Sequence, residues 1–296
     1  MTLVLTVNGP ETIWALADRR LSYERQPPKD DARKIMCLET VDGVGFITYA
    51  GLGITALRTE PSDWVSAVLR GRNLTFEQSL VALAEAAKNQ LPRHVVQLPV
   101  PGHTFVVPAF VGREPRLYTI DLVFAPDRTR SRFDLTRHVA KAGKTPRVGL
   151  AGTGGDYLRQ DHKWLRDLLR VVRANDRGQL PAMAVADHLA RLNMDVHRDN
   201  KKSVGPSCIV AWRPRRGSVH TSGGGAQFYT GTTREGIPSC LPTIGSGMDV
   251  RVLMEAGMRH AMARFEAIRA GQPEPSDDGL REDVARFPHE PDEDLR

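Results

Sequence analysis

Cysteine is scarce in this chain, and its scarcity excludes two kinds of scaffold. Only Cys37, Cys208 and Cys240 occur among 296 residues, and they are far apart and odd in number. This pattern excludes a disulfide framework and a zinc framework, and it predicts a reducing, cytoplasmic compartment. The histidines show no paired metal-ligand spacing, so we expect neither a metal nor another cofactor.

Long apolar runs are also missing, and aromatic residues make up only 6% of the chain. No run approaches the roughly 20 apolar residues that cross a membrane. The apolar start, Met1–Val7, lacks the basic region and the small-residue cleavage site of a signal peptide. Aromatic residues seldom alternate with basic ones, as they do in single-stranded nucleic-acid binding. We therefore expect no membrane span and no nucleic-acid partner.

The net positive charge is unevenly distributed. Residues 271–296 contain nine acidic residues and three arginines and so carry −6, which leaves +12 on the rest of a chain whose total is +6. The arginines of that basic part are dispersed rather than gathered in a stripe, so we interpret them as a solvated surface. The acidic segment also holds four prolines, and we expect it to be a disordered tail.

Strand and hairpin signals open the chain. Two runs of β-branched and apolar residues flank Asn8-Gly9, and two more flank Asp42-Gly43, which predicts four antiparallel strands. Thr75 and Gln78 then form a capping box before apolar residues that recur at helical spacing. A second helix, at 61–70, precedes this one. Strands followed by two helices, without βαβ alternation, argue against a doubly wound sheet.

The later elements repeat this order. They are strands at 104–111, 116–122, 147–151, 207–213 and 217–229, helices at 156–173 and 181–194, and a polar, irregular stretch at 125–145. Two helix pairs on two sheets predict an α+β fold, a four-layer αββα sandwich, over residues 1–230. A linker and a C-terminal helix follow at 231–270, before the acidic tail at 271–296.

Four segments, taken together, resemble the proteasome β-subunit family of N-terminal nucleophile hydrolases. They are Thr2 after Met1, Ala17-Asp18-Arg19-Arg20, Lys34-Ile35, and Tyr49-Ala50-Gly51-Leu52-Gly53. Thr2, Asp18 and Lys34 stand 16 and 16 positions apart, the spacing of the family's threonine, acid and lysine. The resemblance covers residues 2–230. A longer stretch between Lys34 and Gly51 and an unmatched C-terminal extension indicate a divergent, bacterial-type member.

The resemblance implies a role for each of these residues. Once Met1 is removed, the Thr2 hydroxyl is the nucleophile and its own α-amine is the base. Lys34 favours the developing alkoxide and lowers the pKa of that amine, and Asp18 holds Lys34 in place. The backbone N–H of Gly51 faces the oxyanion, where a glycine lets the substrate approach the backbone closely.

The family pattern also assigns supporting residues. Thr153, between Gly152 and Gly154, stands where the family has a serine in a Gly-Ser-Gly turn. Asp199 and Ser203 match an Asp…Ser pair, although they are separated by one residue more than in the family. Leu21 and Tyr49 match the walls of the specificity pocket and predict an apolar or aromatic-bounded pocket for the substrate.

These observations predict an N-terminal threonine hydrolase that cleaves peptide bonds or other amides. The resemblance implies a peptide or protein substrate and homo-oligomeric rings, and it leaves open whether an ATPase or other regulator acts on the site. Two alternatives remain. One is a non-proteolytic amidase of the same fold. The other is a catalytically silent structural or assembly protein, in which the C-terminal helix and tail are the working parts.

Overall fold

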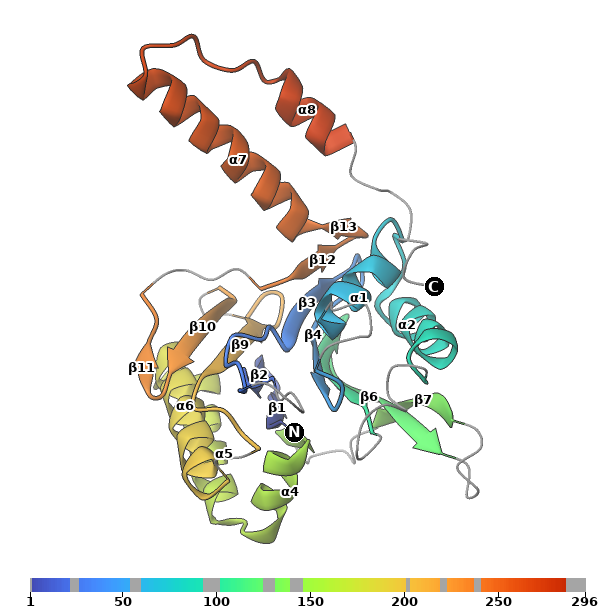
Figure 1. Ribbon diagram of the computed structural model, residues 1–296. Coiled ribbons are helices and arrows are strands. Elements are labelled where there is room, and N and C mark those ends of the chain that lie inside the picture. Colours follow the sequence, from blue (N-terminus) through green and yellow to red (C-terminus); the bar gives the residue numbers. More distant parts are fainter. Residues whose placement is uncertain are drawn as a thin grey trace.

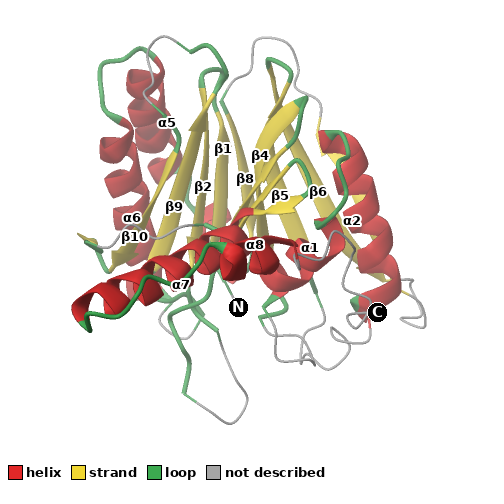
Figure 2. Cartoon of the chain, turned by 90° about the horizontal axis from the view of Figure 1, so that it is seen from above, coloured by secondary structure: helices red, strands yellow, loops and turns green. Residues whose placement is uncertain are grey.

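Two β-sheets lie face to face in the computed structural model, and helices cover both outer surfaces (Figure 1). The structure describes residues 2–21, 27–53, 60–92, 102–124, 131–138, 146–200, 203–218, 223–236 and 241–285. Figure 2 shows the four layers of the sandwich, helix, sheet, sheet and helix. The α+β sandwich predicted from the sequence is therefore confirmed.

The first sheet has the strand order β11-β10-β9-β2-β1-β8. Its strands are β1 (Val4–Asn8), β2 (Thr12–Asp18), β8 (Arg147–Ala151), β9 (Cys208–Pro214), β10 (Gly225–Thr230) and β11 (Thr233–Arg234). The predicted hairpin at Asn8-Gly9 joins β1 to β2, with the Gly9 N–H donating to Thr12 O at 3.0 Å. All five residues of β1 are buried, because the strand has neighbours on both sides and layers on both faces.

The second sheet has the strand order β13-β12-β3-β4-β5-β6-β7. Its strands are β3 (Ile35–Glu39), β4 (Gly43–Ala50), β5 (Thr104–Val111), β6 (Glu114–Phe124), β7 (Ser131–His138), β12 (Thr243–Gly245) and β13 (Met248–Asp249). Asp42 lies in the predicted β3–β4 hairpin, where its carboxylate accepts from the Thr40 hydroxyl at 2.9 Å and from Phe76 N at 2.8 Å. The same side chain thus fixes the hairpin and the start of a helix.

Helices α1 (Pro61–Leu69) and α2 (Phe76–Gln90) cover the second sheet, and α4 (Thr153–Gln160), α5 (Lys163–Asp176) and α6 (Ala182–Asp199) cover the first. The predicted capping box at Thr75 and Gln78 is present at the start of α2. Helices α7 (Val250–Arg269) and α8 (Asp278–Ala285) extend from the sandwich (Figure 1). Among the described residues, no helix is both long and apolar enough to cross a bilayer.

Three apolar layers hold the sandwich together. One lies between the second sheet and its helices and contains Trp64 and Phe76. Another lies between the first sheet and its helices and contains Trp14 and Leu189. The third lies between the sheets, around Phe46. Burial of this apolar surface is the main favourable term that positions the strand ends where the site forms.

Two elements of the sandwich differ from the prediction. Strand β7 occupies part of the stretch 125–145 that was expected to be irregular, with 125–130 and 139–145 outside the described residues. Its apolar Phe133 and Leu135 alternate with polar residues and pack on the helix-side core of the second sheet. Arginines and other polar residues around them hide this alternation. The single helix expected at 156–173 is two helices, α4 and α5, separated at Asp161 and His162.

The C-terminal segments also contain more structure than expected. Strand β12 lies within the predicted linker, yet it pairs parallel with β3, with Ile244 opposite Leu38. Helix α8 lies in the predicted disordered tail, and Asp277, just before it, accepts from His260 Nε2 of α7 at 3.1 Å. The strand expected from residue 217 begins at Gly225. The proposed division at 230 and 270 stays a prediction.

Candidate active site

Thr2 is held by its backbone two residues before the start of β1. The residue is 3% exposed, and its carbonyl oxygen accepts from Gly154 N, at the start of α4, at 3.0 Å. Gly152, the N-cap of α4, has φ +77° and ψ 174°, a conformation essentially restricted to glycine. A Cβ at Gly152 would overlap the Thr2 carbonyl oxygen. The turn between β8 and α4 therefore fixes the position of Thr2.

Lys34 brings its ammonium group to the Thr2 hydroxyl from the other sheet. It directly precedes β3 and is 2% exposed. Its Nζ contacts Thr2 Oγ1 and donates to Asp18 Oδ1 at 3.1 Å and to Arg20 O at 2.6 Å. Three acceptors match the three protons of an ammonium group. The Thr2 hydroxyl accepts from Lys34 in this arrangement, so its own proton is free to be transferred elsewhere.

Asp18, the last residue of β2, is fully buried and completely hydrogen-bonded. Its carboxylate accepts from the backbone N–H groups of Leu3 at 2.9 Å, Gly205 at 3.1 Å and Arg20 at 3.2 Å, besides the Lys34 ammonium. These bonds offset part of the cost of burying a charge. Burial lowers the pKa of the Lys34 ammonium below its ordinary value, whereas Asp18 opposes that shift. The carboxylate thus favours the charged form of Lys34 next to the hydroxyl, and burial disfavours it.

Gly51 follows β4 directly and is exposed, with φ +116°. A Cβ there would overlap the carbonyl oxygen of Gly102, so the close packing of two backbone segments requires glycine. No hydrogen bond from the Gly51 N–H to another described residue is found. Among the described residues this N–H thus has no acceptor, which is a requirement for an oxyanion donor.

The supporting residues predicted from the sequence are not all brought to this cluster. Thr153 is the first residue of α4, and its buried hydroxyl has no partner among the described residues. Asp199 lies at the end of α6 and accepts from the Tyr157 hydroxyl. Ser203 is 7% exposed, but the segment that contains it reaches the site through the backbone of Gly205.

Leu21 and Tyr49 lie in different surroundings. Leu21 is 4% exposed and packs next to Gly53, where an added Cβ would lie 3.1 Å from its side chain. Tyr49 is 2% exposed, belongs to the core between the second sheet and its helices, and stacks on His103 with ring centroids 6.0 Å apart. Residues 22–26 and 54–59 lie outside the described residues, and the role of either side chain in a specificity pocket stays a prediction.

Sequence reasoning missed several residues that build the site. The Arg20 guanidinium forms a two-point ion pair with Asp30, at 2.9 and 3.0 Å, and the Arg20 carbonyl accepts from Lys34. Gly205 reaches Asp18 from a segment 187 positions away. His103 accepts from the Leu52 N–H, beside Gly51. Arg20 belongs to the Ala17-Asp18-Arg19-Arg20 segment noted in the sequence, whereas no local pattern indicates the contacts of Gly205 and His103.

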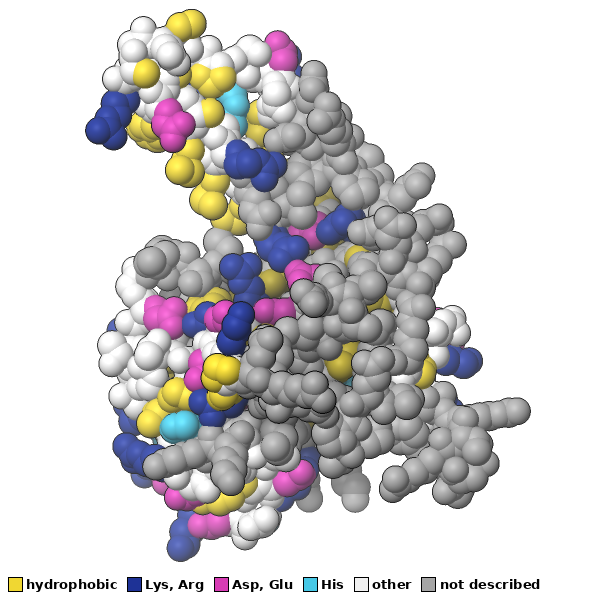
Figure 3. Space-filling model, viewed as in Figure 1, with side chains coloured by type: hydrophobic (Ala, Val, Ile, Leu, Met, Phe, Trp, Pro, Cys, Tyr) yellow, Lys and Arg dark blue, Asp and Glu magenta, His cyan; other side chains and the backbone are white. Residues whose placement is uncertain are grey.

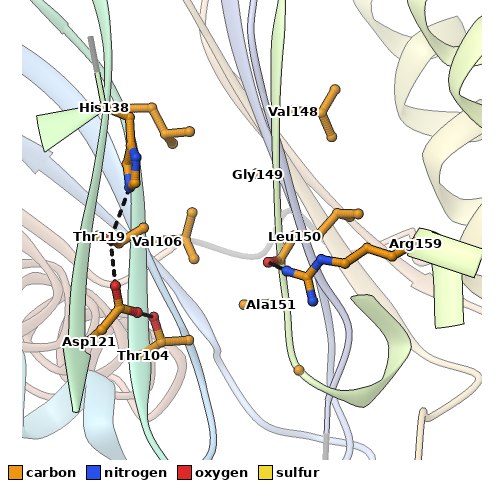
Figure 4. A pocket seen from close by; sticks show the side chains of 12 residues that line it. Thr104, Val106, Thr119, Asp121, His138, Val148, Gly149, Leu150, Ala151 and Arg159 are labelled. Carbon is orange, nitrogen blue, oxygen red and sulfur yellow. Dashed lines mark hydrogen bonds between the residues drawn. The ribbon is translucent and has the colours of Figure 1, made fainter. Parts of the chain in front are cut away.

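A cavity of about 510 Å³ lies beside the turn that holds Thr2. Residues of β8 and its turn, through Gly152, form one wall, and residues of β5, β6 and β7 form the other (Figure 4). Asp121 accepts from the hydroxyls of Thr119, at 2.7 Å, and Thr104 on one wall, while Arg159 lies on the opposite wall. The cavity therefore offers groups of both charges to a polar ligand.

The Gly152 turn generates a stability prediction. We expect Gly152→Ala to lower the free energy of unfolding by at least about 2 kcal/mol more than Gly112→Ala, measured by urea denaturation. Gly112 is a matched control, because it also has positive φ, +60°, but open space around its Cα. The control bears only the left-handed backbone cost, about 1–2 kcal/mol. Equal losses in both variants would contradict tight packing of this turn on Thr2.

Comparisons with known proteins give structural matches only. A scan against protein-family models finds no match, and neither does a search of curated proteins. Solved structures of Anbu proteins match. The Anbu ancestral beta-subunit of Yersinia bercovieri has a TM-score of 0.47 and 13% identity, with 93% of this chain and 99% of that chain covered. The Gly-1 mutant of Anbu from Hyphomicrobium sp. strain MC1 has a TM-score of 0.46 and 13% identity, covering 75% and 85%.

A third match is described as the helical assembly of the Anbu complex from Pseudomonas aeruginosa, with a TM-score of 0.44, 13% identity, and 93% and 99% covered. These findings correct the family predicted from the sequence. Membership of the proteasome β-subunit family of N-terminal nucleophile hydrolases is wrong, because these three structures are Anbu proteins and no family model assigns the chain to such hydrolases.

Proposed function

We propose that this chain is an N-terminal threonine hydrolase of amide bonds, with peptides or proteins as its substrate class. The observation that carries the proposal is the contact of the Lys34 ammonium with the Thr2 hydroxyl inside a buried cluster. A buried lysine with a carboxylate partner is costly, and a functional site is a common reason for retaining one. The proposal depends on this geometry and not on membership of a family.

The mechanism begins with removal of Met1, which frees the α-amine of Thr2. An α-amine has an ordinary pKa of about 7.7–8.0, so it is partly neutral near pH 7 and can accept a proton. The Thr2 hydroxyl gives its proton to this amine while Oγ1 attacks the substrate carbonyl carbon. Lys34, which donates to Oγ1, stabilises the negative charge that develops on that oxygen.

The tetrahedral intermediate carries its charge on the former carbonyl oxygen. The Gly51 N–H donates to this oxyanion, a type of interaction whose loss costs about 10²–10³-fold in rate. The intermediate then collapses, the C–N bond breaks, and the leaving amine takes the proton from the Thr2 ammonium. Water, deprotonated by the Thr2 α-amine, then hydrolyses the ester on Oγ1 and restores the enzyme. Every proton transfer uses a group of the chain, so the reaction balances without a cofactor.

The compartment remains part of this proposal. The described cysteines, Cys37 and Cys208, are both free and buried. Burial raises the pKa of both thiols, which keeps them protonated and inert. Unpaired thiols of this kind support the reducing cytoplasmic location that the sequence predicts.

Thr2 variants test the nucleophile. We expect the native protein to have the mass of a chain without Met1, because the α-amine must be free. Thr2→Ala should lose about 10³-fold or more of its turnover of fluorogenic peptides, since it has no hydroxyl. Thr2→Ser keeps the hydroxyl and should retain measurable turnover. Hydrolysis by Thr2→Ala at the wild-type rate, or a retained Met1 in active protein, would overturn the assignment.

The buried ion pair gives a separate prediction. Lys34→Met should abolish turnover and destabilise the fold by about 3–5 kcal/mol, because Asp18 is left as a buried charge without its cation. The double variant Lys34→Met/Asp18→Asn should regain much of that stability and stay inactive. Urea denaturation and peptide turnover of the same preparations distinguish the two effects. A double variant that regains activity would show that the pair is structural only.

The Lys34→Met variant also has a pH signature. Burial lowers the pKa of Lys34 in the folded protein below the ordinary 10.5. At a pH between the lowered pKa and 10.5, the unfolded chain therefore binds this proton more strongly than the folded protein does. Stability from this group therefore rises with pH through that window. We expect the rise to be absent from Lys34→Met when the free energy of unfolding is measured at increasing pH.

Homo-oligomeric assembly is a further part of the proposal. Helix α7 carries a stripe of exposed apolar side chains with helical spacing, and apolar side chains lie over this extension in Figure 3. The stripe consists of Met254, Met258, Met262, Phe265 and Ile268, which are between 41% and 73% exposed. Exposed apolar patches of this kind mark interaction sites. A second copy of the chain presents the same apolar stripe and is the occupant we propose.

Sedimentation velocity tests this assembly. The wild type should sediment as an oligomer, and a closed ring, which the family resemblance implies, would give one discrete species. Met258→Glu/Phe265→Glu should shift the protein toward monomer, because it places charge in the stripe. Val81→Glu is the matched control, since Val81 is 52% exposed on α2, away from the stripe. A wild type that stays monomeric at high concentration would contradict the proposal.

A further inference from the structure

His103 connects the loop that carries Gly51 to the second sheet. It directly precedes β5, and its carbonyl oxygen accepts from Leu122 N of β6 at 2.9 Å. Its ring nitrogen Nδ1 accepts from the Leu52 N–H at 3.1 Å. The last backbone pair between β4 and β5 joins Ala50 to Thr104. The bond from the Leu52 N–H to the His103 ring thus attaches the chain after β4 to the start of β5, just beyond the last backbone pair of the ladder.

The surroundings of this imidazole would suit an apolar ring. His103 is 4% exposed, stacks on Tyr49, and meets Phe105 edge-on with ring centroids 4.6 Å apart. Burial lowers its pKa to about 3, so the ring is neutral. Since Nδ1 accepts from the Leu52 N–H, Nε2 carries the ring proton, and it has no partner among the described residues.

A phenylalanine would keep the ring contacts of this space, so the feature of histidine that has a described partner, and that phenylalanine lacks, is its Nδ1 acceptor. That acceptor binds the N–H immediately after Gly51. On the other side of Gly51, Ala50 is held by the β4–β5 ladder. Gly51 itself packs against the Gly102 carbonyl so closely that no Cβ fits. Ala50 is held by the ladder and Leu52 by His103, while the Gly102 carbonyl packs against Gly51. The Gly51 peptide therefore has one orientation, and its N–H has no partner among the described residues.

We propose that His103 is a positioning residue that sets the direction of the Gly51 N–H toward the oxyanion. It contacts neither Thr2 nor the reacting atoms, and it acts by accepting the Leu52 N–H. This inference depends on the proposed hydrolase function, because it assigns a supporting residue to the same site. It goes beyond that function by identifying which interaction prepares the oxyanion donor before a substrate arrives.

Three variants separate the acceptor from the packing of the ring. His103→Phe keeps an aromatic ring in the core and removes the acceptor. His103→Asn restores an acceptor, because its Oδ1 is attached to Cγ as Nδ1 is in histidine. Phe133→Leu is the control, since Phe133 is 5% exposed and its ring lies 6.2 Å from that of His103. It weakens the same core and leaves the bond to Leu52 intact.

Peptide turnover gives the first readout. We expect His103→Phe to lower kcat by about 10–100-fold, less than complete loss of an oxyanion donor, with KM within about twofold of the wild type. His103→Asn should recover most of kcat. Phe133→Leu should keep kcat while lowering the thermal midpoint. A His103→Phe variant with wild-type kcat, or a Phe133→Leu variant that loses kcat to the same extent, would overturn the inference.

Two electrophiles distinguish this inference from the function on which it depends. A peptide aldehyde forms a hemiacetal whose oxygen occupies the oxyanion position, whereas a peptide vinyl sulfone alkylates the hydroxyl without forming an oxyanion there. We expect His103→Phe to bind the aldehyde about 10–100-fold more weakly and to react with the vinyl sulfone at the wild-type rate. If the wild type is labelled at Thr2 and the variant binds the aldehyde equally well, His103 is not a positioning residue and the hydrolase stands. If the vinyl sulfone does not label Thr2 in the wild type, both proposals fail.

Discussion

The buried contact between Lys34 and Asp18 is the interaction on which the arrangement of the site depends. Removing two charges from water costs several kcal/mol for each ion even after relaxation, and a single contact seldom repays this. Here the ammonium has three acceptors, and the carboxylate accepts from three backbone N–H groups as well. Lys34 directly precedes β3 of the second sheet, and Asp18 is the last residue of β2 in the first. The pair therefore joins the sheets at the strand ends where Thr2 lies.

Backbone groups rather than side chains complete this cluster. Gly154 holds the Thr2 carbonyl, Gly205 holds Asp18, and Gly152 lies so close to Thr2 that no side chain fits between them. Glycine allows such approach, and backbone N–H groups on rigid elements keep their direction without losing rotamer entropy. The hydroxyl of Thr153, which was predicted to support the site, has no partner among the described residues. Close backbone contacts of glycines therefore position Thr2 and Asp18.

Much of the fold could be predicted because its signals are local. Asn8-Gly9, Asp42-Gly43 and the Thr75 cap each identify an element within a few residues. Strand β12 could not be predicted, because three residues become a strand through pairing with the distant β3 and the two-residue β13. The site divides in the same way. Thr2, Asp18 and Lys34 lie at the ends of three consecutive strands, so their spacing was visible. The contacts of Gly205 and His103 instead join segments 187 and 51 positions apart.

The relative position of the nucleophile and the oxyanion donor depends on the packing between the sheets. Thr2 precedes β1 of the first sheet and Gly51 follows β4 of the second, so no single element holds both. The layer between the sheets contains the immediate chain neighbours of the site residues. These are Ala17 beside Asp18, Ile35 beside Lys34, Ala50 beside Gly51 and Ala151 beside Gly152. Three of the four are alanines, which allow the strand ends to approach closely. Because interiors are packed too tightly to absorb even one added methylene, the spacing of this layer sets the geometry of the site.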